Sequence, residues 1–438
     1  MNNNTINPSW AADGKINDVE LARYILEGYD LLCVNKKLFD KDGMITDTFI
    51  LKNIILELIA PYVKSNIVNR IDQIIETIQL LCSTSSLPLN PQVINVKNGT
   101  LNIDGTFTNE TPVCANRLIV NYNPNAPTPV LWLEFLNGLL SPEDILTLQE
   151  YMGYCFIPTN KAQKMLIIIG NGGEGKSRIG LVLRALLGDN MNTGDVKNLE
   201  KSQFSLANLE YKLLMLDDDM SMEALEKTNV LKSMVTLEAK TELEIKNKQS
   251  FQGLIYSRAL LIGNGSLSAL HDRSYGFYRR QIILEVLPRD VNRVDDPYLI
   301  EKLKDEIEGI FLWCFEGLQR LVANDYRFTI SEKAVANLAN AMEEGNNVIL
   351  FMQSTGYISI ENNSDSTPVS SSKNLCKAYK CWCDDNTYKP LSDKNFISYL
   401  KQHQTDYGII YTNNISTSGG KTVRGFKNIN VLIRPEYT

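Results

Sequence analysis

The sequence lacks the features that mark membrane, secreted or disulfide-held proteins. Its 438 residues contain no apolar run close to the roughly 20 residues that span a bilayer. Residues 1–5 provide neither a basic start nor an apolar core, so no signal peptide is visible. Eight cysteines spread over this length do not form a disulfide framework. We therefore expect a soluble, cytoplasmic protein without a membrane partner.

Histidine is scarce as well, because the chain has only two, and this leaves few ligands for a zinc site. The one cysteine cluster, Cys376, Cys381 and Cys383, has the spacing C-x4-C-x-C and not the paired C-x2-C of structural zinc sites. Residues 376–383 also show the pattern of one amphipathic helix. We expect small buried thiols in this helix, with zinc binding as the alternative.

An overall basic charge is also missing. The formal net charge is −7, which argues against a protein whose whole surface is adapted to DNA. The distribution is uneven, however. Residues 369–438 hold ten Lys or Arg and five Asp or Glu, a balance of +5 that leaves −12 for the rest. A basic C-terminal module on an acidic body is typical of a nucleic-acid tether. A solvated lysine-rich face is the alternative.

The most informative stretch that is present runs from Leu166 to Ser177, with the sequence LIIIGNGGEGKS. Its four apolar residues predict a strand buried on both faces, as in a mostly parallel sheet. Gly170–Ser177 then matches G-x-x-x-x-G-K-[ST] at each fixed position. Glycines let backbone N–H groups turn toward phosphate oxygens. A helix expected from Arg178 to Leu187 adds the partial positive charge of its N-terminus.

We therefore predict a phosphate-binding loop for ATP and Mg²⁺. Its predicted binding residues are Gly170, Asn171, Gly172, Gly173, Glu174, Gly175, Lys176 and Ser177. Lys176 supplies a positive charge to the β- and γ-phosphates, and Ser177 offers its hydroxyl to the metal. A glycine-rich turn that matches by chance is the alternative.

An acidic partner for the loop follows the apolar segment 212–216. Asp217 is predicted to hold the metal, and Asp218 to act as the general base or water-orienting carboxylate. Because a third aspartate, Asp219, follows directly, the sequence does not decide whether these two roles belong to Asp217 and Asp218 or to the next pair. An acidic turn after a buried strand is the alternative.

Two further strands contribute polar residues. The apolar segment 258–263 ends in Asn264, which is placed to contact the γ-phosphate or the attacking water. Arg279 and Arg280 immediately precede the apolar segment 281–284. An arginine pair in this position suits an arginine finger that reaches across a subunit interface and stabilises transition-state charge. The alternative for Asn264 is an ordinary turn residue, and the alternative for the two arginines is a surface pair without a catalytic role.

Between these elements, residues 241–251 alternate as a β-hairpin with a basic tip that contains Lys246 and Lys248. Such lysines can engage phosphates without reading bases, or can simply be solvated. Elsewhere, helices are expected over 49–62 and 67–81, and the polar segment 361–368 is expected to be a linker.

Together these residues resemble superfamily 3 helicases, and especially the phage, plasmid and genomic-island helicases related to poxvirus replicative NTPases. The match is to replication-initiator helicases of staphylococcal cassette or pathogenicity-island type. It is carried by GNGGEGKSRIG (170–180), LLMLDDDM (213–220), IGNGSL (262–267) and DRSYGFYRRQIIL (272–284). Weaker likeness extends over 94–101 and 148–154 and includes the C-terminus. One departure is that many relatives end the second motif in Asp-Glu, whereas this chain has Asp-Asp.

The resemblance implies an α/β fold in four parts, with an AAA+ P-loop ATPase core. These are a mainly helical N-terminal module (1–125), the ATPase core (126–325), a helical connection and linker (326–368) and a winged helix (369–438). It also implies a ring, usually a hexamer, whose pore is lined by the hairpin lysines and whose finger is Arg279 or Arg280.

The winged helix is expected to have helices over 370–382 and 393–401 and wing strands over 409–412 and 429–433, around residues 418–421. In helix-turn-helix domains one helix enters the major groove and basic wing residues hold phosphates. The predicted DNA contacts of this module are Lys394, Lys401, Lys421 and Arg424.

The leading hypothesis is an ATP-dependent DNA helicase that initiates replication of a phage or mobile element and binds both origin duplex and single strands. A P-loop ATPase that packages or remodels DNA without unwinding it is the second. An origin-binding initiator that uses ATP only as an assembly switch is the third. Because the chain is too short for a primase-like segment ahead of the core, we expect no priming activity.

Overall fold

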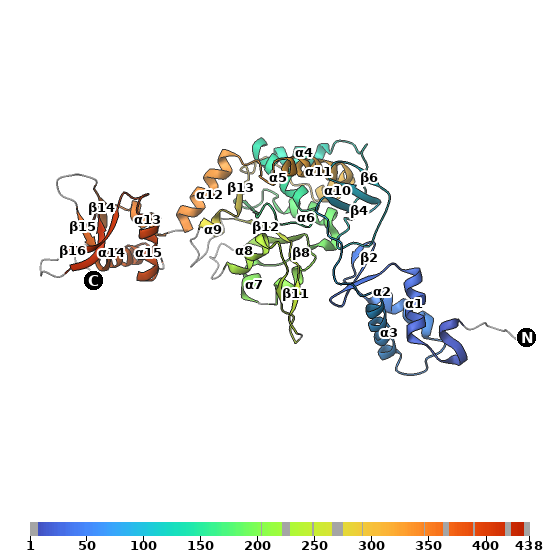
Figure 1. Cartoon of the computed structure of the whole chain (residues 1–438). Helices are drawn as coiled ribbons and strands as arrows, with labels where there is room; N and C mark the ends of the chain where they lie inside the picture. Colours follow the sequence, from blue (N-terminus) through green and yellow to red (C-terminus); the bar gives the residue numbers. More distant parts are fainter. Residues whose placement is uncertain are drawn as a thin grey trace, which may run out of the picture. The chain divides into compact units, whose positions relative to one another are not determined.

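The computed structural model describes most of the chain. The described ranges are 8–202, 204–220, 228–247, 249–264, 275–290, 292–345, 347–361, 368–388, 390–416 and 422–432. The chain forms two compact units: a larger one that contains almost all residues up to Val335, and a smaller one from Ala336 onward (Figure 1). No helix in the described ranges is long and apolar enough to cross a membrane.

A five-stranded parallel sheet lies at the centre of the larger unit. Its strands, in the order in which they lie side by side, are β13 (Gln281–Glu285), β7 (Met165–Ile169), β12 (Arg258–Gly263), β9 (Leu214–Met220) and β8 (Met191–Thr193). All of β12 and nearly all of β7 is buried, because apolar side chains point to both faces. The parallel sheet predicted from the apolar runs is therefore confirmed, and β8 is a strand that the sequence reading missed.

Register decides which residues meet at the edge of this sheet. Ile169 at the end of β7 pairs with Gly263 of β12 on one side and with Glu285 of β13 on the other. The carboxyl ends of the three strands are therefore level. In such α/β sheets the loops at this edge form the binding crevice.

Helices pack around the sheet and connect its strands. In the larger unit they are α4 (Val130–Asn137), α5 (Pro142–Tyr154), α6 (Ser177–Leu187), α7 (Val196–Lys201), α8 (Asn229–Thr236), α10 (Leu299–Asp305) and α11 (Ile307–Ala323). α5 begins with a serine cap, since the Ser141 hydroxyl accepts from the Asp144 N–H, and proline occupies the first helical position. α6 packs closely on β9, because a Cβ at Gly180 would lie 2.7 Å from Leu216 Cδ2.

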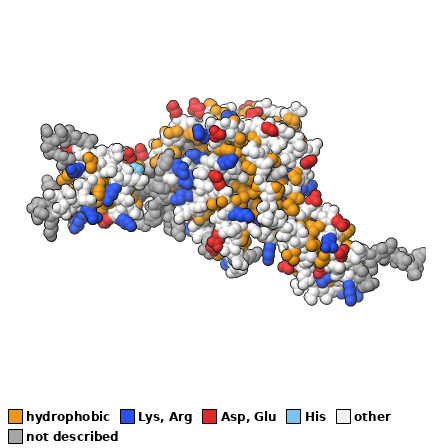
Figure 2. Space-filling model, in the orientation of Figure 1, with side chains coloured by type: hydrophobic (Ala, Val, Ile, Leu, Met, Phe, Trp, Pro, Cys, Tyr) orange, Lys and Arg blue, Asp and Glu red, His pale blue; other side chains and the backbone are white. Residues whose placement is uncertain are grey.

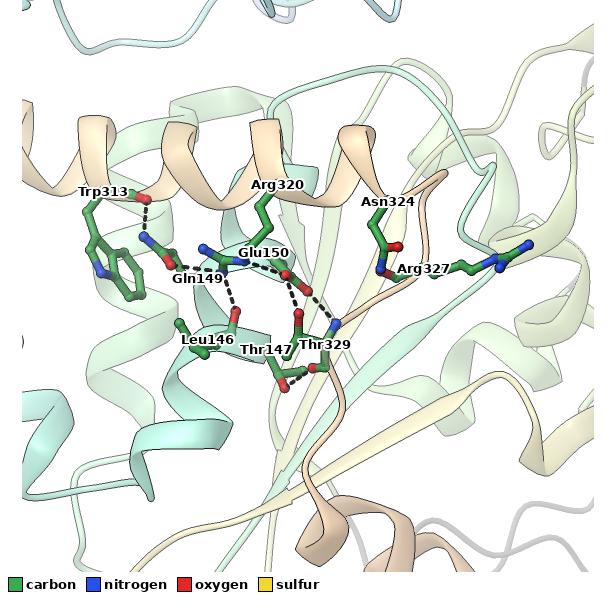
Figure 3. A network of polar contacts seen from close by, with 9 residues as sticks. All are labelled: Leu146, Thr147, Gln149, Glu150, Trp313, Arg320, Asn324, Arg327 and Thr329. Carbon is green, nitrogen blue, oxygen red and sulfur yellow. Dashed lines mark hydrogen bonds and ion pairs between the residues drawn. The ribbon is translucent and has the colours of Figure 1, made fainter.

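A buried polar network joins α5 to α11 (Figure 3). The Glu150 carboxylate accepts from Arg320 Nε (2.7 Å), from the Thr329 N–H (2.7 Å) and from the Thr329 hydroxyl (2.8 Å). Arg320 also donates to Gln149 Oε1 (2.9 Å), and Gln149 donates to the Trp313 carbonyl (2.8 Å). The helices approach so closely that a Cβ at Gly153 would overlap the Cys314 carbonyl oxygen, so only glycine fits there.

The N-terminal part of the larger unit has a core of its own. Its elements are α1 (Asp18–Gly28), β1 (Leu32–Val34), β2 (Lys37–Asp40), β3 (Gly43–Met44), α2 (Phe49–Ile59) and α3 (Ile67–Leu81). Isoleucines spaced along α2 and α3, such as Ile55, Ile74 and Ile78, are fully buried in this core. β4 (Val93–Val96), β5 (Gly99–Asn102) and β6 (Phe107–Thr108) instead pack into the core of the central sheet. The expected module 1–125 therefore spans two hydrophobic cores.

The smaller unit follows α12 (Glu332–Gly345), which crosses the boundary at Val335. Its elements are α13 (Asn347–Gln353), β14 (Ile358–Ile360), β15 (Val369–Ser371), α14 (Ser372–Asp385), α15 (Asp393–Gln402), β16 (Ile410–Ser416), β17 (Thr422–Lys427) and β18 (Ile429–Val431). Phe351, Tyr379, Trp382 and Phe396 form its aromatic core. Serine caps begin both α14 and α15, through Ser371 and Ser392.

Three details of this unit differ from the sequence expectation. β18, which was expected to be a wing strand, pairs with β14, whereas β17 pairs with β16 and with β15. The unit also begins well before residue 369, because α13 and β14 contribute to its core. The polar stretch 361–368 consequently connects two strands of one unit instead of linking two domains, although residues 362–367 lie outside the described ranges. Cys376 and Cys383 lie on the buried face of α14, which confirms the predicted helix.

Candidate functional site at the carboxyl edge of the sheet

The glycine-rich loop connects β7 to α6. Gly172, Gly173 and Gly175 have φ of +104°, +82° and +100°, values that side-chain-bearing residues rarely adopt. The loop can therefore turn its peptide groups inward, and α6 begins at Ser177 directly after it. The predicted strand, loop and helix all lie where the motif put them.

Lys176 and Glu174 form a buried pair inside the loop. Lys176 Nζ lies 2.8 Å from Glu174 Oε2, and the two side chains are only 7% and 4% exposed. The Asn171 N–H donates to Glu174 Oε1 (2.6 Å) and the Gly172 N–H to Glu174 Oε2 (3.0 Å). Burial raises the pKa of the Glu174 carboxyl, but the hydrogen bonds from Lys176 and the loop amides outweigh it, so the pKa is lowered. Glu174 is therefore an anion at neutral pH.

A cavity of about 720 Å³ opens beside the loop. Four segments of the larger unit line it: the loop and the start of α6, the end of β9, the end of β12, and the segment before α10. Its lining includes Lys176, Ser177, Asp218, Asp219, Asn264 and Arg293. The structure therefore brings together Asn264 and the loop, which are separated by almost 90 positions in the chain.

The three consecutive carboxylates of β9 are arranged differently from one another. Asp218 and Asp219 are exposed and line the cavity. Asp217 is 5% exposed, and its carboxylate accepts from the N–H groups of Val196 (2.8 Å) and Asp219 (3.3 Å). Burial raises the pKa of the Asp217 carboxyl, partly opposed by these two hydrogen bonds. Asp217, the predicted metal ligand, is not among the described residues that line the cavity.

Strand geometry gives the reason for this arrangement. Side chains two residues apart in a strand share a face, and Leu216 points to α6, the helix that follows the loop. Asp217 therefore points to the face opposite Leu216. A bulge after the Leu261–Asp217 pair then adds a residue to β9 and keeps Asp219 at the same edge. The apolar run before the carboxylates predicts a strand, but it does not predict which of the three carboxylates faces the cavity.

Two arginines that the motifs did not indicate donate hydrogen bonds to the loop, and one of them, Arg293, also lines the cavity. They belong to the segment between β13 and α10. Arg293 Nη1 donates to the Glu174 carbonyl (2.6 Å), and Arg289 Nη1 to the Gly173 carbonyl (3.2 Å). Asp295 forms ion pairs with both guanidinium groups. A pair of arginines four residues apart in a loop carries no signal that sequence reasoning could have used.

Arg279 and Arg280 lie at the opposite edge of the sheet. They precede Gln281, which pairs with Met165 at the start of β7, whereas the loop follows the end of β7. Five strand residues separate the two edges by roughly 15 Å. Arg279 is exposed, and its carbonyl oxygen accepts from Lys164 Nζ (2.5 Å). Burial and the charge of Arg279 lower the pKa of Lys164. The arginine pair therefore does not approach the loop of its own chain.

The residues predicted to contact DNA lie in both units. Lys246 is exposed between β10 (Thr241–Leu243) and β11 (Phe251–Gly253), which confirms the hairpin. In the smaller unit Lys394, Lys401 and Arg424 are exposed, and Lys401 Nζ lies 3.7 Å from the centroid of the Tyr411 ring. Figure 2 shows several Lys and Arg side chains on the visible face of this unit. Residues 248 and 421, which complete the predicted sets, lie outside the described residues.

The fold and the site define a class: a mixed α/β protein with a parallel sheet and a glycine-rich, lysine-containing loop at its carboxyl edge. The model of a family of unknown function (DUF5906) matches residues 168–280, which run from β7 to the arginine pair. This match covers a minority of the chain. No curated protein matches the chain in sequence.

Solved structures of the C-terminal region of NrS-1 are similar to the chain in fold. One has a TM-score of 0.54 at 13% identity and covers 93% of this chain and 99% of that chain. Another has a TM-score of 0.53 at 13% identity, with 96% and 100% covered. At this level of identity the likeness concerns the fold alone. It extends over almost the entire length of both chains.

Proposed function

We propose that the protein is an ATP-dependent DNA helicase that works as a ring and initiates replication of a phage or mobile genetic element. The observation that carries this proposal is the single cavity that joins the loop, two exposed carboxylates and Asn264. A phosphate cradle, oxygen ligands for a hard metal ion and a water-orienting amide are the parts that nucleotide hydrolysis needs.

The donor set fits Mg²⁺. Ser177 supplies a hydroxyl and Asp218 and Asp219 supply carboxylates, all of them the hard oxygen ligands that this ion takes alongside phosphate oxygens. We assign the metal to Ser177 and Asp218, because both line the cavity beside the loop, whereas Asp217 is not among the described residues that line it. When bound, the ion neutralises charge on the β- and γ-phosphates. Asp217 retains this role only if its carboxylate leaves the Val196 N–H.

The chain's own residues then divide the remaining work. Lys176 and the inward N–H groups of the loop hold the phosphates, and the N-terminus of α6 adds its partial charge. Asp219 and Asn264 lie where they can orient an attacking water. Arg279 or Arg280 serves the site of a neighbouring subunit, since roughly 15 Å separates this pair from its own loop. A site that needs an arginine from a neighbouring subunit supports a ring, for which we propose six copies.

DNA contacts are proposed for two places. The hairpin tip with Lys246 and Lys248 lies in the chain between the carboxylates of β9 and Asn264, so it can move with the nucleotide cycle. In the smaller unit, the helices α14 and α15 followed by the strand order β15-β17-β16 support the proposal of a winged helix. Its exposed Lys394, Lys401 and Arg424, with Lys421, are proposed to hold origin duplex.

Strand displacement on a forked duplex tests the proposal. Wild type with ATP and Mg²⁺ should separate the strands, and Lys176→Ala should not, because it loses the charge that contacts phosphate. Hydrolysis without displacement would instead assign the protein to DNA-remodelling ATPases. ATP binding without turnover would make ATP an assembly switch. Electron microscopy of the same mixture should show rings on the DNA.

A further inference from the structure

Glu174 is the one acidic side chain of the loop, and it is turned into the loop instead of toward solvent. Its two carboxylate oxygens accept hydrogen bonds from the Asn171 N–H, the Gly172 N–H and the ammonium of Lys176, at 2.6, 3.0 and 2.8 Å. These are the types of donor that a phosphate-binding loop offers to phosphate. The loop thus contains an anion of its own.

The surrounding structure holds this arrangement in place. A Cβ at Gly170 would lie 3.0 Å from Lys176 Nζ and 3.1 Å from Glu174 Oε1, so the pair fills the space that the missing side chain leaves. Arg293 also fixes the carbonyl of Glu174. The main chain at residue 174 is therefore held with its side chain pointing inward, and the carboxylate is charged at neutral pH.

We infer that Glu174 sets the affinity of the loop for phosphate by competing with it for Lys176. This inference rests on the proposed function of the loop. A phosphate group that binds the Lys176 ammonium must separate it from the Glu174 carboxylate, which lies 2.8 Å away. Charge-assisted hydrogen bonds of this kind are stronger than hydrogen bonds between neutral groups. The same carboxylate favours release of the product, because it recaptures Lys176 when the phosphate leaves.

Glu174→Gln tests the inference, since glutamine keeps the shape of the side chain and removes its charge. The probes are inorganic pyrophosphate and ADP, titrated calorimetrically without Mg²⁺ so that no hydrolysis intervenes. We expect Glu174→Gln to bind pyrophosphate about tenfold more tightly than wild type, a ratio equivalent to about 1.4 kcal/mol. Glu174→Ala should change the affinity in the same direction. Lys176→Ala should abolish binding in either background.

A matched control removes a negative charge from the same edge of the sheet without touching the loop. Glu285, at the end of β13, is half exposed and pairs with Lys333 (3.2 Å). Glu285→Gln should leave the pyrophosphate affinity within about twofold of wild type, because exposed charges are screened. A tenfold gain in this variant too would mean a general charge effect and overturn the inference.

Unchanged or weaker pyrophosphate binding by both Glu174 variants, with circular dichroism spectra like wild type, would also overturn it, because the carboxylate would then brace the loop. The proposed function fails separately. If the tenfold gain is seen but wild type hydrolyses no ATP under any DNA condition, the competition stands and the helicase does not.

Discussion

At the scale of single residues, the site depends on which way each carboxylate of β9 faces. Asp217 is held by backbone N–H groups and has a raised pKa because it is buried. Asp218 and Asp219 are exposed to the cavity. Three identical side chains therefore have different surroundings within one strand, and the strand's alternation and bulge cause the difference.

Substitution of the neighbouring aspartates should separate their roles. Asp218→Asn should lower Mg²⁺-dependent ATP turnover by about 100-fold or more, the scale of losing a positioned catalytic group. Asp217→Asn should keep more activity than Asp218→Asn, because its amide oxygen can still accept from the Val196 N–H, although the amide nitrogen cannot accept from the Asp219 N–H. Steady-state hydrolysis over a range of Mg²⁺ concentrations measures both. The reverse ranking would return the metal to Asp217.

The pH dependence of stability should report on Glu174. Its folded-state pKa is lowered, so its contribution to stability is present above the unfolded pKa of about 4.3 and is lost as the pH falls through the folded value. Wild type should therefore keep its advantage over Glu174→Gln down to about pH 4.3 and lose it as the pH decreases further through the folded-state pKa. Urea unfolding midpoints across this range provide the measurement. A constant difference between the two proteins would contradict the lowered pKa.

At the scale of elements, the contact between α5 and α11 positions the sheet and its loop. Tyr151 on α5, the residue after Glu150, donates its hydroxyl to the Ala259 carbonyl of β12 (2.7 Å). A change in how α5 packs would therefore reach the strand that carries Asn264. Glycine at Gly153 and Gly317 permits this close packing.

Glu150→Gln should destabilise the larger unit by about 1–3 kcal/mol, because an amide cannot accept from Arg320 and from two Thr329 donors as a carboxylate does. Chemical denaturation measures the free energy of unfolding. Glu143→Gln, at the exposed start of the same helix, serves as the control and should change it by less than about 0.5 kcal/mol. Equal effects of the two substitutions would show that the Glu150 network makes no particular contribution to stability.

The edge position of the arginine pair makes a prediction for mixtures of subunits. If Arg279 or Arg280 completes the neighbour's site, each defective subunit should spoil the site beside it. Arg279→Ala or Arg280→Ala mixed with wild type should therefore reduce ATPase activity in more than linear proportion. Arg280→Ala is expected to have the stronger effect, because it adjoins β13 directly. A strictly linear loss would indicate protomers that act independently.

At the scale of the whole molecule, the proposed nucleotide site and the basic charge lie in different units. The cavity belongs to the larger unit, whereas the segment from residue 369 onward has a balance of +5 in a chain of net charge −7. The proposed DNA tethering and the proposed ATP turnover should therefore be separable. The cut must respect the real boundary, since removal from residue 369 would leave α13 and β14 without the core they share.

Deletion of residues 346–438, directly after α12, should preserve ATP hydrolysis and abolish selection of origin duplex over random duplex. The Lys246→Ala, Lys248→Ala double variant should do the reverse and lose strand displacement with origin binding intact. Fluorescence anisotropy on duplex and displacement on a fork measure the two activities. Origin selection by the truncated protein would move sequence recognition to the N-terminal part.

The sequence by itself determined the features that arise from short-range order. The apolar run, the glycine spacing and the following helix predicted β7, the loop and α6 within a residue or two, because backbone preferences and side-chain periodicity act locally. The strand 258–263, the helix 67–81 and the serine-proline start of α5 were predictable for the same reason.

Only the tertiary structure decided the relations between distant segments. The register of β9 against β12 turned Asp218 toward the cavity, and the parallel pairing of β13 with β7 placed Arg279 and Arg280 at the far edge. Pairing of β18 with β14 set the extent of the smaller unit, and Arg293 reached the loop from more than 100 positions away. Each of these depends on long-range hydrogen bonding and packing, whose partners no local pattern in the sequence specifies.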